Sequence, residues 1–192
     1  MARGPAGPTP PPPQRRAQLL LVALAFFGPV LLAIGLYYGS GWRPPGRSNH
    51  GVLIDPPRAL SSSLFHGKWS LVYVGSGACD ADCRQTLHYM HQTHLGLGRL
   101  YDRVQPVFLV TGQCCDRAFL AHEYPRLTTV DTADPGAAAG PALLAVFPPE
   151  RRATSIFIVD PRGNLMMRYD SRAAPEGLLD DLKKLLNLSS IG

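Results

Sequence analysis

Cysteines and acidic residues are both scarce in this sequence, and their positions matter more than their number. Four cysteines in 192 residues are too few for a scaffold held together by disulfides. They come as two close pairs, which favours redox or metal chemistry. No acidic residue precedes Asp55, whereas Arg3, Arg15 and Arg16 do, so the net charge of +5 is unevenly spread.

Several function classes lack their usual sequence signals. The chain has no glycine-rich phosphate loop, no Gly-x-Ser-x-Gly nucleophile elbow and no His-Glu-x-x-His zinc motif. Lysine and arginine form no stripe interleaved with aromatic residues, so a nucleic-acid partner is not expected. A mildly basic surface suits an anionic membrane or an acidic partner instead.

Charged residues are absent from Ala17 to Trp42. As a helix this stretch would span roughly 39 Å, which exceeds the ~30 Å hydrocarbon core of a bilayer. Pro29 would kink such a helix, and membrane helices tolerate such kinks. Tyr37, Tyr38 and Trp42 cluster at its far end, as aromatic residues do at membrane interfaces. We therefore predict one transmembrane helix over residues 17–42.

The residues before this helix set its expected orientation. Residues 1–16 are rich in proline and glycine and are expected to form a disordered tail. Arg15 and Arg16 adjoin the helix, so the positive-inside rule predicts a cytoplasmic tail and places residues 43–192 across the membrane. A cleaved signal peptide is the alternative. Its apolar core would be too long, and the Tyr37-Tyr38 region lacks a clear small-x-small cleavage site.

Beyond the membrane segment, an irregular linker is expected over residues 43–63, because this stretch is rich in proline and serine. Regular elements follow it. β-Branched and aromatic residues predict strands, and apolar residues at helical spacing predict helices. The expected strands cover residues 69–74, 107–110, 155–159 and 165–169, and the expected helices cover residues 83–97 and the segment that begins at Pro175.

The order of these elements predicts the fold. A strand–helix–strand unit is followed by a looser insert over residues 111–149, with a short helix near Arg117–Glu123. The turn Asp160-Pro-Arg-Gly163 then joins two strands into a hairpin before the last helix. This order predicts an α/β fold over residues 64–192, with a thioredoxin-like mixed sheet flanked by helices.

One cysteine pair follows the first strand directly. Cys79-Asp-Ala-Asp-Cys83 lies at the opening of the first helix of the sheet domain, where functional groups collect in open α/β sheets. A helix N-terminus stabilises a thiolate through its dipole and free N–H groups. The spacing of four allows the two sulfurs to form a disulfide or to share one soft metal ion. We predict that Cys79 and Cys83 are the functional thiols.

The second pair follows the next parallel strand. Cys114 and Cys115 are expected near the same edge of the sheet, as resolving thiols or auxiliary ligands. The alternative is a loop pair packed as small apolar residues. A disulfide between adjacent cysteines would be strained, which favours a link to Cys79 or Cys83 over an internal one.

The histidines form no cluster around the first pair. His88, His91 and His94 would lie about 7, 12 and 16 Å from Cys83 along the helix axis, which excludes them from a cysteine-centred site. His94 falls near the apolar stripe and is expected in the core. His122 follows the second pair closely, and it is the candidate for a third metal ligand.

The residues around the first pair resemble a known family. Gly67-Lys-Trp-Ser-Leu-Val-Tyr-Val-Gly75, the Cys79/Cys83 motif and Val159-Asp-Pro-x-Gly163 look like the SCO/SenC cytochrome c oxidase assembly proteins. The resemblance covers roughly residues 50–188. The lead-in around Asn49-His50-Gly51 looks like a small anchored branch of that family.

This resemblance implies an inner-membrane protein with a periplasmic domain, or its mitochondrial equivalent. It would deliver copper to a cytochrome oxidase subunit, or reduce that subunit's copper-binding cysteines, through Cys79 and Cys83. The family's third ligand is a histidine before the third strand, whereas this chain has Arg152 near that place and no histidine. A general thiol–disulfide oxidoreductase and a non-catalytic binding module are the alternatives.

Overall fold

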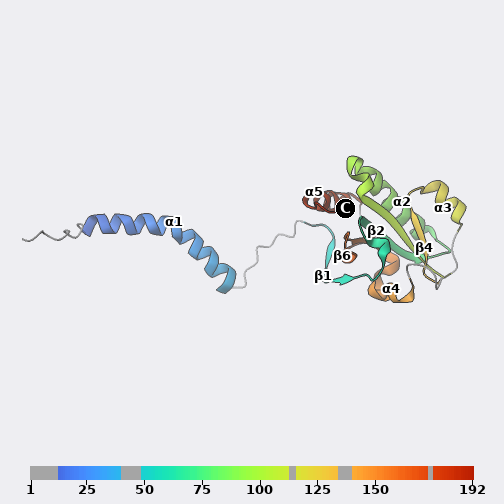
Figure 1. The fold of residues 1–192 in the computed structure, drawn as a ribbon, viewed down its shortest axis with the longest axis horizontal. Coiled ribbons are helices and arrows are strands. Elements are labelled where there is room, and N and C mark those ends of the chain that lie inside the picture. The colour runs from blue at the N-terminus through green and yellow to red at the C-terminus, as the bar shows by residue number, and fades with distance from the viewer. Residues whose placement is uncertain (1–12, 40–48, 113–115, 134–139, 173–174) are drawn as a thin grey trace, which may run out of the picture. The chain divides into compact units, whose positions relative to one another are not determined.

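The computed structural model describes residues 13–39, 49–112, 116–133, 140–172 and 175–192. The chain divides into two units, Met1–Arg47 and Ser48–Gly192. The described residues of the first unit form one helix, and those of the second form a sheet with its helices (Figure 1).

Helix α1 (Pro13–Gly39) contains the predicted membrane segment. Its Ala17–Gly39 portion has 23 residues and includes an 18-residue window with a mean hydropathy of 2.7, so it is long and apolar enough to cross a membrane. Pro29 lies inside the helix, as expected. The end of the predicted segment, residues 40–42, lies outside the described residues.

The predicted disordered tail is wrong for residues 13–16, because α1 begins at Pro13. Proline suits the first turn of a helix, where its missing N–H would have no partner in any case. Residues 1–12 lie outside the described part of the chain.

Six strands form one mixed sheet in the order β1-β6-β5-β2-β3-β4. β2, β3 and β4 run parallel, whereas β5 pairs antiparallel with β2 and β6, and β1 pairs antiparallel with β6. The bounds are β1 Val52–Ala59, β2 Trp69–Ser76, β3 Val104–Thr111, β4 Thr128–Asp131, β5 Ser155–Val159 and β6 Asn164–Asp170.

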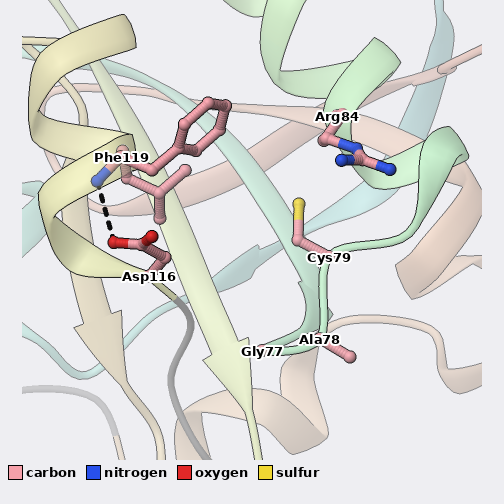
Figure 2. Close-up of a pocket in the computed structure, with 7 residues that line it drawn as sticks. Gly77, Ala78, Cys79, Arg84, Asp116 and Phe119 are labelled. Atoms are coloured by element: carbon pink, nitrogen blue, oxygen red, sulfur yellow. Dashed lines mark hydrogen bonds between the residues drawn. The ribbon is translucent and has the colours of Figure 1, made fainter.

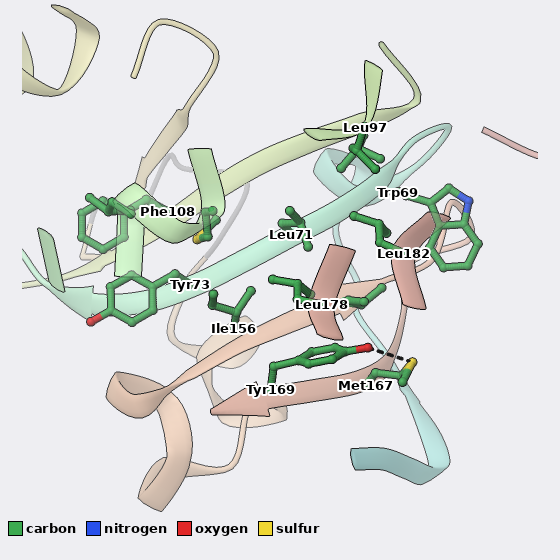
Figure 3. Close-up of a cluster of buried hydrophobic side chains, with 14 of the residues drawn as sticks. Trp69, Leu71, Tyr73, Leu97, Phe108, Ile156, Met167, Tyr169, Leu178 and Leu182 are labelled. Carbon is green, nitrogen blue, oxygen red and sulfur yellow. Dashed lines mark hydrogen bonds between the residues drawn. The ribbon is translucent and has the colours of Figure 1, made fainter. Parts of the chain in front are cut away.

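Helices cover both faces of this sheet. α2 (Ala81–Gly96) and α5 (Pro175–Leu188) bury leucines against Leu71 and Phe108 on one face (Figure 3). α4 (Pro141–Val146) packs on the other face, in the cluster that contains Val72 and Phe157. Successive residues of β2 alternate between the two clusters, as the period of a strand requires. The arrangement confirms the predicted fold class.

The insert holds more structure than its sequence indicates. The short helix α3 (Arg117–Glu123) is confirmed, but β4 and α4 were not predicted. β4 is only four residues long and α4 only six, so neither is long enough to show a period. The described part of the domain also contains three 3-10 helices: Ser63–Phe65, Gly98–Arg103 and Pro149–Thr154.

The predicted linker over residues 43–63 is wrong from residue 52, because β1 forms an edge of the sheet there. Most of its side chains are exposed, so it lacks the alternation that marks a half-buried strand. It also contains Pro56 and Pro57, which are depleted in strands generally but tolerated at an edge. The folded domain therefore begins before residue 64.

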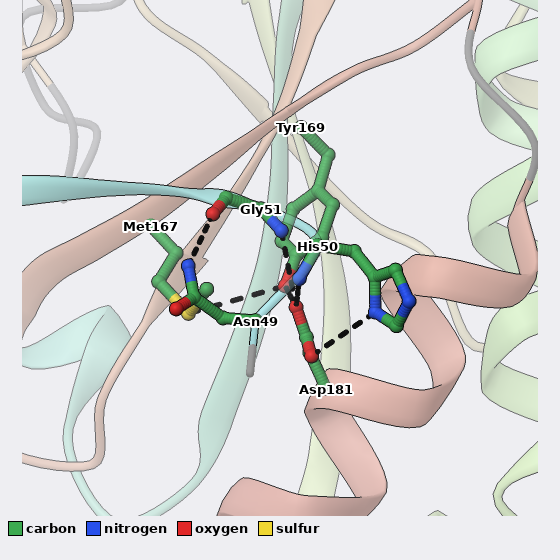
Figure 4. Close-up of polar contacts among 6 residues, drawn as sticks. All are labelled: Asn49, His50, Gly51, Met167, Tyr169 and Asp181. Atoms are coloured by element: carbon green, nitrogen blue, oxygen red, sulfur yellow. Dashed lines mark hydrogen bonds and ion pairs between the residues drawn. The ribbon is translucent and has the colours of Figure 1, made fainter. Parts of the chain in front are cut away.

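Asp181 of α5 fastens the segment that enters β1 (Figure 4). Its Oδ2 accepts hydrogen bonds from the amides of His50 (2.6 Å) and Gly51 (3.0 Å) and from the hydroxyl of Tyr169 (2.7 Å). The side chain is only 4% exposed. Burial by itself would raise the pKa of Asp181, but the hydrogen bonds outweigh burial and lower it.

Candidate functional site

The cysteine pair lies at the turn between β2 and α2, at the edge of the sheet where the parallel strands end. The Gly77 amide donates to the carbonyl of Thr111 (3.2 Å), which holds the turn against the end of β3. The Cys79 amide donates to the Ser76 carbonyl (3.1 Å), and Cys79 itself has a φ of 38°. This left-handed turn directs the chain from the strand into the helix.

Asp80 is the N-cap of α2. Its carboxylate accepts a hydrogen bond from the amide of Cys83 (3.0 Å), so it satisfies one of the free N–H groups of the first turn. Cys83 is thereby held in the first turn of the helix, with its Cα 5.0 Å from that of Cys79. Local helix chemistry therefore sets the spacing of the pair.

Cys79 and Cys83 form a disulfide. The two sulfurs have different surroundings. Cys83 is 2% exposed and belongs to the core cluster with Leu87 and Met90, whereas Cys79 is only partly buried. An external thiol can therefore reach Cys79 but not Cys83.

A pocket of about 280 Å³ opens beside Cys79. Its lining residues come from the turn after β2, from α2 and from the start of α3: Gly77, Ala78, Cys79, Arg84, Asp116, Phe119 and Leu120. In Figure 2 the Cys79 sulfur points into the space between Arg84 on α2 and Phe119 on α3. Cys83 does not line this pocket.

The two charged residues of the pocket have different roles. The Asp116 carboxylate caps α3 by accepting a hydrogen bond from the Phe119 amide (2.9 Å). Within the described ranges, no carboxylate forms an ion pair with Arg84. Its guanidinium is therefore available to a bound partner.

Tyr73 lies in the core close to the start of α2. Its ring stacks on Phe108 with centroids 5.5 Å apart, and its hydroxyl donates to the carbonyl of Ala153 (3.3 Å). Burial, with a smaller contribution from the charge of Asp80, raises the pKa of Tyr73 to about 12. The hydroxyl therefore stays protonated at neutral pH.

Of the other predicted site residues, only the histidines can be placed relative to this pocket. Cys114 and Cys115 lie outside the described residues. His122 is on α3 and does not line the pocket. Its side chain is 85% exposed, and its Nδ1 lies 3.1 Å from Oε1 of Glu123. His94 is buried in the core, as expected.

Arg152 stands near the place where a ligand histidine was expected, but its side chain is committed elsewhere. Its guanidinium donates to the carbonyls of Phe147 and Leu144 at the end of α4. The Leu144 carbonyl also accepts from the Phe147 amide (3.1 Å), so Arg152 is a second donor to it at the end of the helix.

A resident three-ligand copper site does not fit these residues. Across the described part of the chain, no three His, Cys, Asp or Glu side chains gather into a group that could hold a metal ion. The two soft donors of the site are joined in a disulfide, and thiolate is the form that ligates.

Arg84 and Phe119 were not predicted as site residues. Arg84 directly follows Cys83, which was the one available signal. Phe119 reaches the site from the insert, and no sequence pattern links it to the cysteines.

Comparison with solved structures supports the fold assignment. Apo Sco1 from Thermus thermophilus is 22% identical, with a TM-score of 0.55, and the match covers 71% of this chain and 96% of that one. Yeast Sco1 with copper bound is 14% identical, with a TM-score of 0.52, and the match covers 75% and 96%. At these identities the likeness shows the fold alone. No curated protein sequence matches.

A protein-family profile described as transmembrane-like, thioredoxin-like, C-terminal domain matches residues 69–189. The match includes Cys79, Cys83 and every helix and strand from β2 to α5. The matched residues make up more than half of the chain, so the chain belongs to the transmembrane-like, thioredoxin-like family.

Proposed function

We propose that this chain is a divergent, membrane-anchored Sco-type assembly factor that exchanges disulfides with the cysteines of a cytochrome c oxidase subunit. The observation that carries the proposal is the asymmetry of the Cys79–Cys83 disulfide. One sulfur opens onto a pocket and the other is buried behind it. This is the arrangement that directional exchange requires.

The exchange reaction follows from the position of each sulfur. In the reduced protein, the Cys79 thiolate attacks one sulfur of the partner's disulfide, and the partner's other sulfur leaves as a thiolate. The Cys83 thiolate then attacks Cys79, which reforms the Cys79–Cys83 disulfide and releases the partner's first sulfur as a second thiolate. The partner gains two electrons, and a dithiol reductant of the same compartment must return two electrons to this chain.

The choice of an oxidase subunit as partner is supported by two features. The fold is similar to that of Sco proteins. The sequence around the cysteine motif also resembles that family. The apolar helix α1 can hold the domain at the membrane in which an oxidase resides. The copper-binding cysteines of such a subunit must be reduced before they can bind metal.

Copper delivery is the second candidate function. Yeast Sco1 has been solved with copper bound, and two reduced thiolates favour Cu(I). Here copper would be a transient cargo on Cys79 and Cys83, because no third ligand is gathered around them in the described residues. His122 as that ligand stays a prediction. It is tested by Cu(I) competition titrations of the reduced protein with and without His122→Ala.

We also propose that the tail is cytoplasmic and the domain periplasmic. Arg15 and Arg16 before the apolar helix support this orientation. Protease added to intact spheroplasts is expected to digest the domain.

The exchange is tested by trapping its intermediate. Full-length protein in detergent, carrying Cys114→Ser and Cys115→Ser to remove other thiols, is reduced and mixed with a peptide disulfide. Cys83→Ser is expected to accumulate a mixed disulfide through Cys79, because no second thiol resolves it. Cys79→Ser is expected to form almost none, because Cys83 is only 2% exposed. Mass spectrometry distinguishes the adducts.

Equal trapping by the two variants would contradict the proposed role of Cys79. The oxidase partner is tested separately in cells, where Cys79→Ser/Cys83→Ser is expected to lower the amount of assembled oxidase. Normal assembly with both cysteines replaced would rule out the oxidase proposal. Normal assembly that is lost only when the whole domain is removed would instead support a binding module.

A further inference from the structure

We infer that the pocket beside Cys79 selects the sequence around the partner's cysteine: an apolar side chain packs on Phe119 and an acidic side chain pairs with Arg84. The inference rests on the proposed exchange reaction and names the class of segment that it acts on. That segment is a short stretch of partner chain in which the exchanging cysteine has one apolar and one acidic neighbour.

The position of the accessible sulfur requires the partner to enter this pocket. Cys79 lines the pocket, whereas Cys83 is buried in the core and does not. A partner sulfur that bonds to Cys79 therefore brings its flanking residues between α2 and α3. A volume of about 280 Å³ accommodates one or two side chains but no folded element.

The α3 side of the pocket offers apolar surface. Phe119 is 42% exposed although its neighbour Leu120 is 4% exposed and belongs to the core. A partner side chain that packs on this half-exposed phenylalanine would remove apolar area from water. Aromatic side chains in such positions carry a large share of binding energy at interfaces.

The α2 side of the pocket offers a positive charge. Arg84 is exposed and lacks an ion-pair partner in the part of the chain that the structure describes. Two carboxylates near the site have other partners, since Asp80 caps α2 and Asp116 caps α3. An acidic side chain of the partner would therefore meet attraction at Arg84, and a basic side chain would meet repulsion.

The opposite placement of these groups sets a direction for the bound segment. Figure 2 shows Asp116 on the α3 side and Arg84 on the α2 side, with Cys79 between them. An acidic residue placed toward α3 would face Asp116, so the acidic neighbour belongs on the α2 side and the apolar neighbour on the α3 side. The pocket thereby distinguishes the flanks of a cysteine, which the disulfide itself cannot do.

The test compares the rates at which peptide disulfides react with the reduced full-length protein in detergent, in the Cys114→Ser/Cys115→Ser background. One peptide has an acidic and an apolar neighbour beside its cysteine. A second replaces the acidic residue by lysine, and a third replaces the apolar residue by glycine. Hydroxyethyl disulfide, which is small and neutral, is measured with every variant, and each peptide rate is divided by that rate.

For the unsubstituted pocket, the acidic–apolar peptide is expected to give the highest ratio. Arg84→Glu should lower that ratio about fivefold and raise the ratio for the lysine peptide, with both effects weakened by salt. Phe119→Ser should lower the ratio for the acidic–apolar peptide about tenfold, so that this peptide no longer reacts faster than the glycine peptide. Arg117→Glu and Leu95→Ser are the matched controls, because both residues are exposed and neither lines the pocket.

The outcomes separate the two claims. If the protein reacts with none of the disulfides, hydroxyethyl disulfide included, the proposed function fails. If it reacts with all three peptides at equal ratios, or if Arg117→Glu changes the ratios as much as Arg84→Glu does, the exchange stands and the selection by this pocket is wrong.

Discussion

His94 shows how burial of one residue links the stability of the domain to pH. Its side chain is buried in the core, and its ring stacks on Tyr101 with centroids 3.8 Å apart. Nε2 lies 3.0 Å from the Tyr101 carbonyl and 2.9 Å from the Val104 carbonyl, so this nitrogen carries the proton. Nδ1 is buried and has no hydrogen-bond partner among the residues that the structure describes. Burial therefore lowers the pKa of His94, and the folded domain holds the ring neutral.

A lowered histidine pKa predicts loss of stability in mild acid. The unfolded chain takes up a proton near pH 6.5, while the folded chain resists it until a lower pH, so the unfolded state binds more protons in between. The free energy of unfolding should therefore fall as the pH drops below 6.5. His94→Gln, which keeps an amide donor for the two carbonyls, should flatten that slope. Urea denaturation between pH 5 and 8 measures it.

His88→Gln is the control for this prediction, since His88 is exposed on the same helix. It should leave the slope unchanged. An unaltered slope in His94→Gln would assign the pH dependence to another group. Asp181 is excluded from this range, because hydrogen bonds overcome burial and lower its pKa, so its stabilising effect is lost only in stronger acid.

Helix α2 depends on how it begins, because its first turn holds one of the two sulfurs. Asp80 supplies the capping carboxylate, so Asp80→Ala should lower the free energy of unfolding of the domain by about 1 kcal/mol. Asp80→Asn should cost much less, because asparagine caps equally well. Comparison of the two by urea denaturation separates the cap from the charge. An equal loss in both variants would mean that the charge, and not the cap, stabilises the turn.

Elements with a clear apolar run or period were predictable from the sequence, and elements without either were not. The apolar runs of β2, β3 and β5 are buried on both faces, and their sequences mark them as strands. β1 is exposed along most of its length and contains two prolines, so only its pairing with β6 makes it a strand. The cysteine pair was predicted from its place after β2. The pocket was not, because Phe119 comes from the insert and meets Cys79 only in the folded chain.

The whole chain joins an apolar helix to a domain whose first residues are held by Asp181. The buried carboxylate accepts hydrogen bonds from the amides of His50 and Gly51, which come before the first strand. A domain that begins at β1 would lack the two amide donors. Of the three hydrogen bonds to the Asp181 Oδ2 atom, only the one from the Tyr169 hydroxyl would remain. The boundary of the stable unit is therefore set by a polar contact and lies ahead of the sheet.

Truncation tests this boundary. A fragment of residues 48–192 should have the same free energy of unfolding as the domain of the full chain. A fragment of residues 52–192, with its N-terminus acetylated so that no new charge faces Asp181, should have a free energy of unfolding about 2–3 kcal/mol lower. The loss arises because a buried carboxylate is left short of donors. Asp181→Asn should destabilise the longer fragment clearly. It should destabilise the shorter fragment much less, because that fragment already lacks the two amides that donate to the carboxylate. Urea denaturation of the four proteins gives this coupling. If Asp181→Asn costs both fragments the same, the carboxylate acts within the sheet and α5 and does not hold the entering segment.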